Sequence, residues 1–194
     1  MNPFLSPQQQ DRFVLASRSP RRIEILRGLG FEFETEAPPE YLEDDAEHHD
    51  PHEIARMLAV RKCEFVALTR AHDRVLAADT IVVIDDTVLQ KPVSDAEARE
   101  FLGRLSGRVH TVVTGIAIHY QGKTRTGAER TQVTFRTLSA AQIAAYVATG
   151  EGRDKAGSYA AQGVGAGLIR RIEGCFFNVI GLPVGLLFDL LQQE

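Results

Sequence analysis

The first thirty residues have the pattern of a strand, a tight turn and a helix. The apolar run Phe13–Ala16 predicts a short buried strand, because an unbroken apolar run of this length suits a strand covered on both faces. Ser19 is a typical N-cap residue, and Pro20 follows at the first helical position, where its missing N–H leaves no bond unmade. Apolar residues at helical spacing continue to Gly30, where the helix is expected to end.

The rest of the chain continues this alternation of strands and helices. We interpret Val75–Ala78 as a second buried strand that ends in Asp79-Thr80, followed by a hairpin that turns at Asp85-Asp86. Further strands are expected at 110–120, 126–137 and near 168–172, and further helices at 51–68, 94–105, 139–150 and from about 183. The pattern predicts a mixed, twisted α/β sheet with flanking helices. At 194 residues, it fits a single domain, 1–194, with a short polar N-terminal extension, 1–11.

Charge and composition exclude several classes of protein. The net charge is -4, from 22 basic and 26 acidic residues, which argues against a nucleic-acid-binding protein. The two cysteines, Cys63 and Cys175, are too few and too far apart for a disulfide framework or a zinc ribbon. Residues 1–11 lack the apolar core that a signal peptide needs, and no apolar run approaches the roughly 18 residues that span a membrane. We therefore expect a cytoplasmic protein that binds no nucleic acid and no membrane.

The turn before the first predicted helix gathers groups that bind anions. Ser17 and Ser19 supply hydroxyls, and Arg21 and Arg22 supply guanidinium groups. They lie at a helix N-terminus, where free N–H groups and the positive end of the helix dipole attract anions. Guanidinium forks also match phosphate oxygens. We interpret the segment as a phosphate-binding turn, although it lacks the pattern of a Walker loop. The alternative is a plain N-cap followed by solvated arginines.

Two acidic positions are candidates for metal binding or proton transfer. Asp79 and Thr80 directly follow an apolar strand, and α/β sheets bind ligands beyond the carboxyl ends of their strands. Glu43 lies in an acidic connection, together with Glu40, and one such carboxylate can share Mg²⁺ with Asp79. The alternatives are a turn residue for Asp79 and a solvated acidic loop for Glu43.

Three lysines and one glutamine complete the candidate residues. Lys62, Lys91 and Lys155 together are able to neutralise a triphosphate, whereas each alone is typical of a solvated surface lysine. Gln162 lies in a glycine-rich stretch, and its amide offers a donor and an acceptor that suit the edge of a nucleobase. The alternative for this stretch is a flexible connector.

Taken in order, these segments resemble the signatures of the Maf family of nucleoside triphosphate pyrophosphatases. Leu15–Leu26 is similar to the family's opening signature, Ala78-Asp79-Thr80 to its second and Lys91-Pro92 to its third. Further matches follow in the family's order: Leu105-Ser106-Gly107, Val133–Arg136, Asp154–Tyr159 with Gln162-Gly163, and Gly181-Leu182-Pro183. The resemblance extends from about Phe13 to Leu191.

The resemblance implies a fold similar to that of inosine triphosphate pyrophosphatases, with two lobes around a cleft. It implies hydrolysis of a nucleoside triphosphate to the monophosphate and pyrophosphate with a divalent metal cation, Mg²⁺ or Mn²⁺, by a homodimer. By position, Asp79 would be the general base that acts on water near the α-phosphorus, and both Asp79 and Glu43 would hold the metal. Glu40 remains an alternative to Glu43, because the acidic connection lacks the family's tidy acidic doublet. The positions that would bind and select the substrate are Ser17, Ser19, Arg21, Arg22, Lys62, Thr80, Lys91, Lys155 and Gln162.

The family divides by the base of its substrate. The string Asp154–Gly163 is similar to the branch that hydrolyses dTTP, UTP and some modified pyrimidine triphosphates. The other branch prefers 7-methyl-GTP, where an acidic residue is expected near Gln162 to suit the positively charged base. Besides 7-methyl-GTP hydrolysis, the alternative function is that of a non-catalytic, nucleotide-binding regulator of septum formation.

Overall fold

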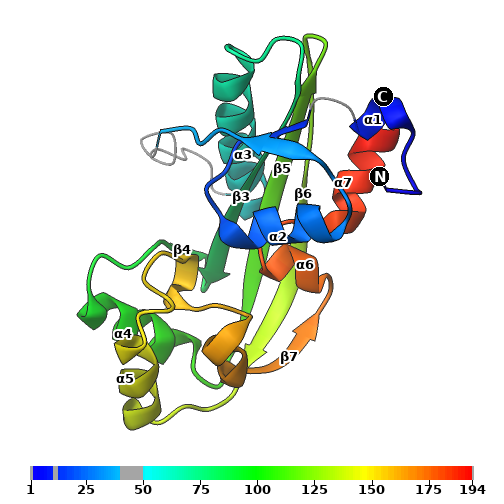
Figure 1. Cartoon of the computed structure of the whole chain (residues 1–194). Coiled ribbons are helices and arrows are strands. Elements are labelled where there is room, and N and C mark those ends of the chain that lie inside the picture. Colours follow the sequence, from blue (N-terminus) through cyan, green and yellow to red (C-terminus); the bar gives the residue numbers. More distant parts are fainter. Residues whose placement is uncertain (1, 11–12, 40–49, 194) are drawn as a thin grey trace. The chain divides into compact units, whose positions relative to one another are not determined.

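The computed structural model describes residues 2–10, 13–39 and 50–193, which form a mixed α/β protein (Figure 1). The order of helices and strands follows the alternation that the sequence predicts. The elements are α1 (Pro7–Gln10), β1 (Phe13–Leu15), α2 (Pro20–Gly28), β2 (Phe33–Thr35), α3 (Pro51–Ala67), β3 (Arg74–Ile84), β4 (Thr87–Leu89), α4 (Asp95–Leu105), β5 (Val109–Tyr120), β6 (Lys123–Phe135), α5 (Ala140–Ala148), η2 (Ala156–Ser158), η3 (Gly163–Leu168), β7 (Ile169–Glu173), α6 (Phe176–Val179) and α7 (Val184–Gln192).

The strands of the described residues form a seven-stranded sheet with the order β2-β1-β3-β5-β6-β7, in which β4 also pairs with β3. β1 runs parallel to both β2 and β3, whereas β4 and β7 are antiparallel to their neighbours. The predicted mixed α/β class is therefore confirmed. The chain divides into two compact units: residues 1–79, 114–129 and 181–194 form the first, and residues 80–113 and 130–180 the second.

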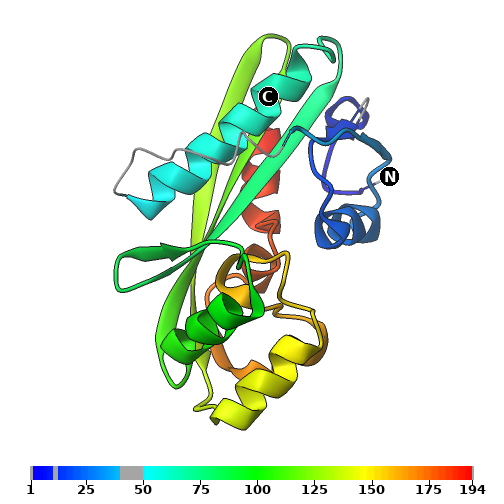
Figure 2. The same cartoon turned by 90° about the vertical axis from the view of Figure 1, so that its left-hand side faces the viewer.

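In the first unit, α3 and α7 cover opposite faces of the paired β5 and β6 (Figure 2). Glycines allow both helices to approach closely. A Cβ atom on Gly115 of β5 would lie 2.1 Å from the carbonyl oxygen of Ala55 in α3. A Cβ atom on Gly127 of β6 would lie 3.0 Å from the side chain of Leu186 in α7. Small side chains such as Ala59 continue this close packing into the core of the unit.

The N-terminal segment is attached to the same unit. Asn2 and Leu5 are buried, and the Asn2 side-chain amide donates to the carbonyl oxygen of Leu29 at 2.8 Å. The Gln9 amide donates to the carbonyl oxygen of Leu191 at 2.7 Å, so α1 lies beside the end of α7 (Figure 1). Residues 2–10 are therefore part of the packed structure of this unit.

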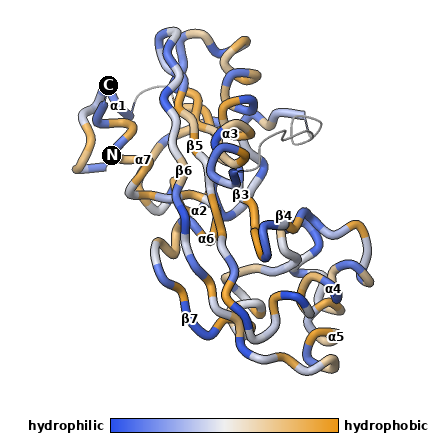
Figure 3. The backbone as a smooth tube through the Cα atoms, turned by 180° about the vertical axis from the view of Figure 1, so that it is seen from behind, coloured by the Kyte–Doolittle hydropathy of each residue, from blue (hydrophilic) through white to orange (hydrophobic). Residues whose placement is uncertain are grey.

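In the second unit, β3 and β4 form the predicted hairpin. Asp85 and Asp86 have φ values of 51° and 55°, as a two-residue hairpin turn of mirror-image type requires. Figure 3 shows the change from the apolar end of β3 to this hydrophilic turn. The helices α4 and α5 contact each other, and both start as predicted, with the hydroxyls of Ser94 and Ser139 accepting a backbone N–H.

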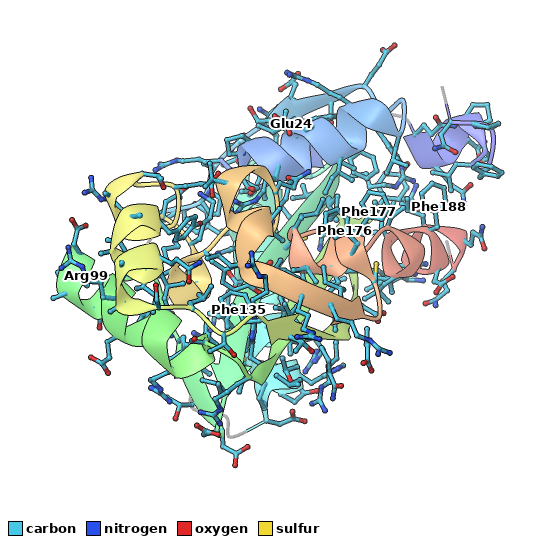
Figure 4. All side chains as sticks on the ribbon, turned by 90° about the horizontal axis from the view of Figure 1, so that it is seen from below. Glu24, Arg99, Phe135, Phe176, Phe177 and Phe188 are labelled. Carbon is cyan, nitrogen blue, oxygen red and sulfur yellow. The ribbon has the colours of Figure 1, made fainter. Side chains whose placement is uncertain are left out.

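An aromatic cluster lies in the second unit, around Phe135 at the end of β6 (Figure 4). The rings of His110, Phe135 and Tyr159 contact one another edge to face, with centroids 4.8 to 5.4 Å apart. The Nε2 atom of His110 is 2.8 Å from the hydroxyl oxygen of Tyr159. The cluster connects β5 and β6 to the glycine-rich segment that follows α5.

Two expectations about strands are wrong. Asp79 and Thr80 do not end a strand, because β3 continues without interruption from Arg74 to Ile84. The carboxylate of Asp79 lies within the strand because it pairs with the buried ammonium group of Lys62. Residues 33–35, where no strand was expected, also form a strand, β2, which pairs with β1. At three residues, with Glu34 and Thr35 exposed, β2 has too few apolar positions to show a strand pattern.

Candidate functional site

The turn between β1 and α2 is held together by the Ser17 hydroxyl. Ser17 is buried, and its Oγ accepts one hydrogen bond from the N–H of Ser19 and one from Nη1 of Arg22, both at 3.1 Å. Ser19 occupies the N-cap position of α2, as predicted, but its side chain makes no capping hydrogen bond. The turn thus keeps its shape through Ser17 and leaves the Ser19 side chain out of the helix cap.

Arg21 and Arg22 occupy the first turn of α2 but differ in their partners. Nε of Arg22 donates to the carbonyl oxygen of Gly181 at 2.7 Å, which fixes the direction of its guanidinium group. Nε of Arg21 is one of three buried side-chain polar atoms of the described residues that have no hydrogen-bond partner. A buried donor without a partner is costly, so the Arg21 guanidinium is suited to bind an acceptor such as a phosphate oxygen.

Lys62 and Asp79 form a buried ion pair in the same unit. The Nζ atom of Lys62, on α3, donates to Oδ1 of Asp79, on β3. The side chains keep only 8% and 11% of their surface exposed. Charged groups are rarely buried unless they are paired, and this pairing explains how a carboxylate lies in the middle of an apolar strand. Two of the predicted site residues are therefore brought into direct contact.

The register of the sheet relates the turn to this ion pair. β1 and β3 are parallel, and Leu15 lies opposite Leu76. Ser17 follows Leu15 by two residues and Asp79 follows Leu76 by three, so both come just beyond the last register pair of neighbouring strands. The first unit thus places hydroxyl and guanidinium groups and a buried carboxylate at one end of β1. Such a set is able to bind an anion and to orient a water molecule.

The residues suit a magnesium-type ion only in part. Asp79 offers carboxylate oxygens, which hard divalent cations prefer, and Mg²⁺ often takes one or two carboxylates together with phosphate oxygens. The described residues contain no group of three or more histidine, cysteine, aspartate or glutamate side chains arranged to hold a metal. Glu43 and its alternative, Glu40, lie outside the described residues.

The remaining predicted site residues belong to the second unit. Thr80 is half-buried on β3, and Lys91 is exposed after β4. Nζ of Lys155 donates to the carbonyl oxygen of Glu151 at 2.6 Å and pairs with Asp154. Gln162 is exposed and directly precedes η3, so its amide is accessible to solvent.

Three contacts made by or close to the predicted site residues were not predicted from the sequence. The carbonyl oxygen of Gly181 accepts a hydrogen bond from Nε of Arg22. The carboxylate of Glu151 accepts hydrogen bonds from the N–H groups of Val164 and Gly165. His110 contacts Tyr159 next to the glycine-rich segment. In the sequence, Gly181 is marked only by its place in the family-like segment Gly181-Leu182-Pro183, and Glu151 only by the glycines on either side of it. Neither feature identifies the hydrogen-bond partner.

Burial shifts the pKa values of three ionisable side chains. It lowers the pKa of His110 to about 4 and raises the pKa of Tyr159 well above its usual value, because each neutral form is favoured in an apolar environment. Burial also raises the pKa of Cys63 to about 12, so its thiol stays protonated at neutral pH. With 0% of its surface exposed, Cys63 packs as a small buried hydrophobe.

Comparison with known proteins reveals relatives along nearly the whole chain. A family model described as "Maf-like protein" matches residues 12–194. A dTTP/UTP pyrophosphatase of Deinococcus radiodurans is 42% identical over 181 residues, which are 93% of this chain and 92% of that protein. A dTTP/UTP pyrophosphatase of Symbiobacterium thermophilum is 45% identical over 183 residues, 94% of this chain and 93% of that protein.

Solved structures are more distant. A structure described as a nucleoside-triphosphatase / dITP/XTP pyrophosphatase from Mycobacterium abscessus is similar with a TM-score of 0.44 and 20% identity, over 63% of this chain and 73% of that one. No helix among residues 2–10, 13–39 and 50–193 is long and apolar enough to cross a membrane.

Proposed function

The chain belongs to the Maf family, and on that basis we propose that it is a dTTP/UTP pyrophosphatase, which hydrolyses the triphosphate to the monophosphate and pyrophosphate. One observation carries the proposal. Relatives that are 42% to 46% identical, over 92% or more of this chain, are dTTP/UTP pyrophosphatases. The buried Lys62–Asp79 pair supports it, because such a buried carboxylate is suited to act on water.

In this proposal, the turn before α2 binds phosphate oxygens. The unpartnered Nε of Arg21 gains an acceptor when an anion arrives, and Arg22 is already fixed by Gly181 and Ser17. Ser19 contributes its hydroxyl, which does not serve as a helix cap. Anion binding at such a turn is favoured by the N-terminal end of the helix and by bidentate guanidinium contacts.

Asp79 acts as the general base in this mechanism. Lys62 holds Oδ1, which fixes the orientation of the carboxylate. We assign Oδ2 as the oxygen that accepts the proton from water. Oδ2 accepts a proton as the water oxygen attacks the α-phosphorus in line with the bond to the leaving pyrophosphate. Positioning and charge stabilisation provide most of the acceleration in phosphoryl transfer, so the rigid setting of Asp79 matters as much as its basicity.

A divalent metal cation, Mg²⁺ or Mn²⁺, is the proposed cofactor. Asp79 would hold it, together with Glu43 or the alternative Glu40, and when bound it would neutralise charge on the phosphate oxygens. Carboxylate oxygens are the donors that such cations prefer, which is the support that the chain itself offers.

Four further residues are proposed to contact the substrate. Lys91 and Lys155 bind phosphate oxygens, and Thr80 and Gln162 select the base. The exposed amide of Gln162 offers a donor and an acceptor that match the edge of uracil or thymine. We also propose a homodimer that acts in the cytoplasm on free nucleotides, with no nucleic-acid partner; sedimentation velocity tests the dimer.

The test is pyrophosphate release by the purified protein with Mg²⁺ or Mn²⁺ across a panel that includes dTTP, UTP, CTP, GTP and 7-methyl-GTP. We expect dTTP and UTP to have the highest kcat/KM. A preference for 7-methyl-GTP would contradict the choice of base while keeping the reaction. Tight binding of dTTP without turnover of any nucleotide would indicate a regulator instead of an enzyme.

A further inference from the structure

Glu151, which follows α5, clamps the glycine-rich segment that contains Gln162. Its Oε1 accepts the N–H of Val164 at 3.0 Å, and its Oε2 accepts the N–H of Gly165 at 2.7 Å. Each carboxylate oxygen therefore holds one of two consecutive amides at the start of η3. Hydrogen bonds to a charged acceptor are stronger than those between neutral groups, so this clamp fixes the backbone directly after Gln162.

The same residue also holds Lys155. The Nζ atom of Lys155 donates to the backbone carbonyl of Glu151 at 2.6 Å, and only 14% of the lysine side chain is exposed. A single residue thus connects two of the proposed substrate contacts, through its carboxylate to the segment of Gln162 and through its carbonyl to Lys155. A shift of Glu151 would move both contacts together.

The backbone on both sides of Gln162 is held in place, and Gly163 leaves room for the Glu151 carboxylate. Gly163 has a φ of 69°, and a Cβ atom there would lie 2.2 Å from Oε1 of Glu151. On the other side of Gln162, the N–H of Ala160 donates to the hydroxyl of Tyr146 at 3.0 Å. Gln162 therefore projects into solvent between two anchored backbone positions, which lowers the entropy that base recognition must overcome.

We infer that Glu151 is a positioning residue for base selection, which sets the place of Gln162 and Lys155 without touching the reacting atoms. The inference rests on the proposed roles of those two residues. It assigns a functional task to a carboxylate that the reaction itself does not use. Because the clamp acts on binding and leaves the water and Asp79 untouched, its loss must change KM far more than kcat.

The experiment compares wild type, Glu151→Gln and a matched control, Glu173→Gln. The control removes the same charge in the same unit, from a surface carboxylate that pairs with Arg171. Three quantities are measured for each: kcat and KM for dTTP and UTP, the dissociation constant of dTTP without metal, and amide hydrogen exchange of Val164 and Gly165. For Glu151→Gln we expect KM to rise at least about tenfold with kcat within about threefold of wild type. We expect amide exchange at both positions to accelerate by about tenfold or more, and the control to behave as wild type.

Several results would overturn the inference. These are an unchanged KM despite faster amide exchange, a lower kcat with unchanged KM, or the same rise of KM in Glu173→Gln. If Glu151→Gln does not fold, Glu151→Asp is tested instead, since the shorter carboxylate keeps the charge but does not span both amides. If the wild type hydrolyses no nucleotide, the proposed function fails; unchanged dTTP binding in Glu151→Gln would then refute the positioning role, and weakened binding would support it.

Discussion

Lys62 and Asp79 form a buried ion pair that links α3 to the middle of β3. The two residues are 17 positions apart in the sequence. Asp79 is the one charged residue between positions 75 and 84, and its carboxylate lies against the Lys62 ammonium group. A buried pair of this kind adds little net stability, but it is costly to break. Its main effect is to hold one carboxylate in one orientation, which is what a general base requires.

Replacing the proposed base removes turnover and leaves binding. Asp79→Asn keeps the size of the side chain but no longer accepts a proton, so we expect kcat to fall by about 10²- to 10⁴-fold. The dissociation constant of dTTP, measured by calorimetry without metal, should stay within about threefold of wild type, since Arg21 and Arg22 are unchanged. A near-normal kcat in Asp79→Asn would show that another group is the base.

The ion pair predicts non-additive effects on stability. Lys62→Met and Asp79→Asn each leave a buried polar or charged group without its partner, and we expect each to lower the free energy of unfolding by about 3 kcal/mol. The double variant should lose clearly less than the sum, because no unpaired charge remains. Urea denaturation of the four proteins measures the coupling. Strictly additive losses would mean that the two side chains do not interact in solution.

Because β5 approaches α3 closely at Gly115, adding one methyl group there is expected to lower stability strongly. Gly115→Ala would place a Cβ atom 2.1 Å from the carbonyl oxygen of Ala55, so α3 must shift and the protein should lose about 1 to 3 kcal/mol of stability. The matched control is Gly103→Ala in α4, where the new Cβ would meet no atom within 4 Å apart from its sequence neighbours and the nearby backbone of its own helix. That change should stabilise the protein by about 0.5 to 1 kcal/mol. Thermal unfolding of both variants checks the contrast, and equal effects would refute the packing argument.

Buried His110 makes stability sensitive to acid. In the unfolded chain its pKa is near 6.5, whereas burial lowers the pKa to about 4 in the folded protein. Between these values the unfolded state binds a proton that the folded state does not, so stability falls as the pH drops from about 6.5 to about 4, by roughly 3 kcal/mol in total. Unfolding by urea at a series of pH values should show this loss in wild type and in His72→Gln, at an exposed position. The loss should be much smaller in His110→Gln, and parallel curves would exclude His110 as its source.

Helix starts were predictable because their signals are local. Asp50 accepts the N–H of His52, and Ser139 and Gln142 form a reciprocal capping box within four residues. The full length of β3 was not predictable, because a carboxylate inside a strand depends on Lys62, which comes from another element. β2 has only three residues, two of them exposed, and its identity depends on pairing with β1.

The same distinction applies to the candidate site. Ser17, Arg21 and Arg22 are recognisable because they are neighbours in the sequence at a helix start. The carbonyl of Gly181 that fixes Arg22 lies 159 residues away, and no local pattern indicates it. The clamp of Glu151 was not predictable because it involves backbone amides 13 and 14 residues away, which carry no side-chain signature.

The most direct test of the account is hydrolysis of dTTP in water enriched in ¹⁸O, with the products analysed by mass spectrometry. Attack of the water held by Asp79 on the α-phosphorus predicts one ¹⁸O atom in dTMP and none in the released pyrophosphate. Label in the pyrophosphate, or release of dTDP and orthophosphate, would contradict the proposed reaction and the role of Asp79.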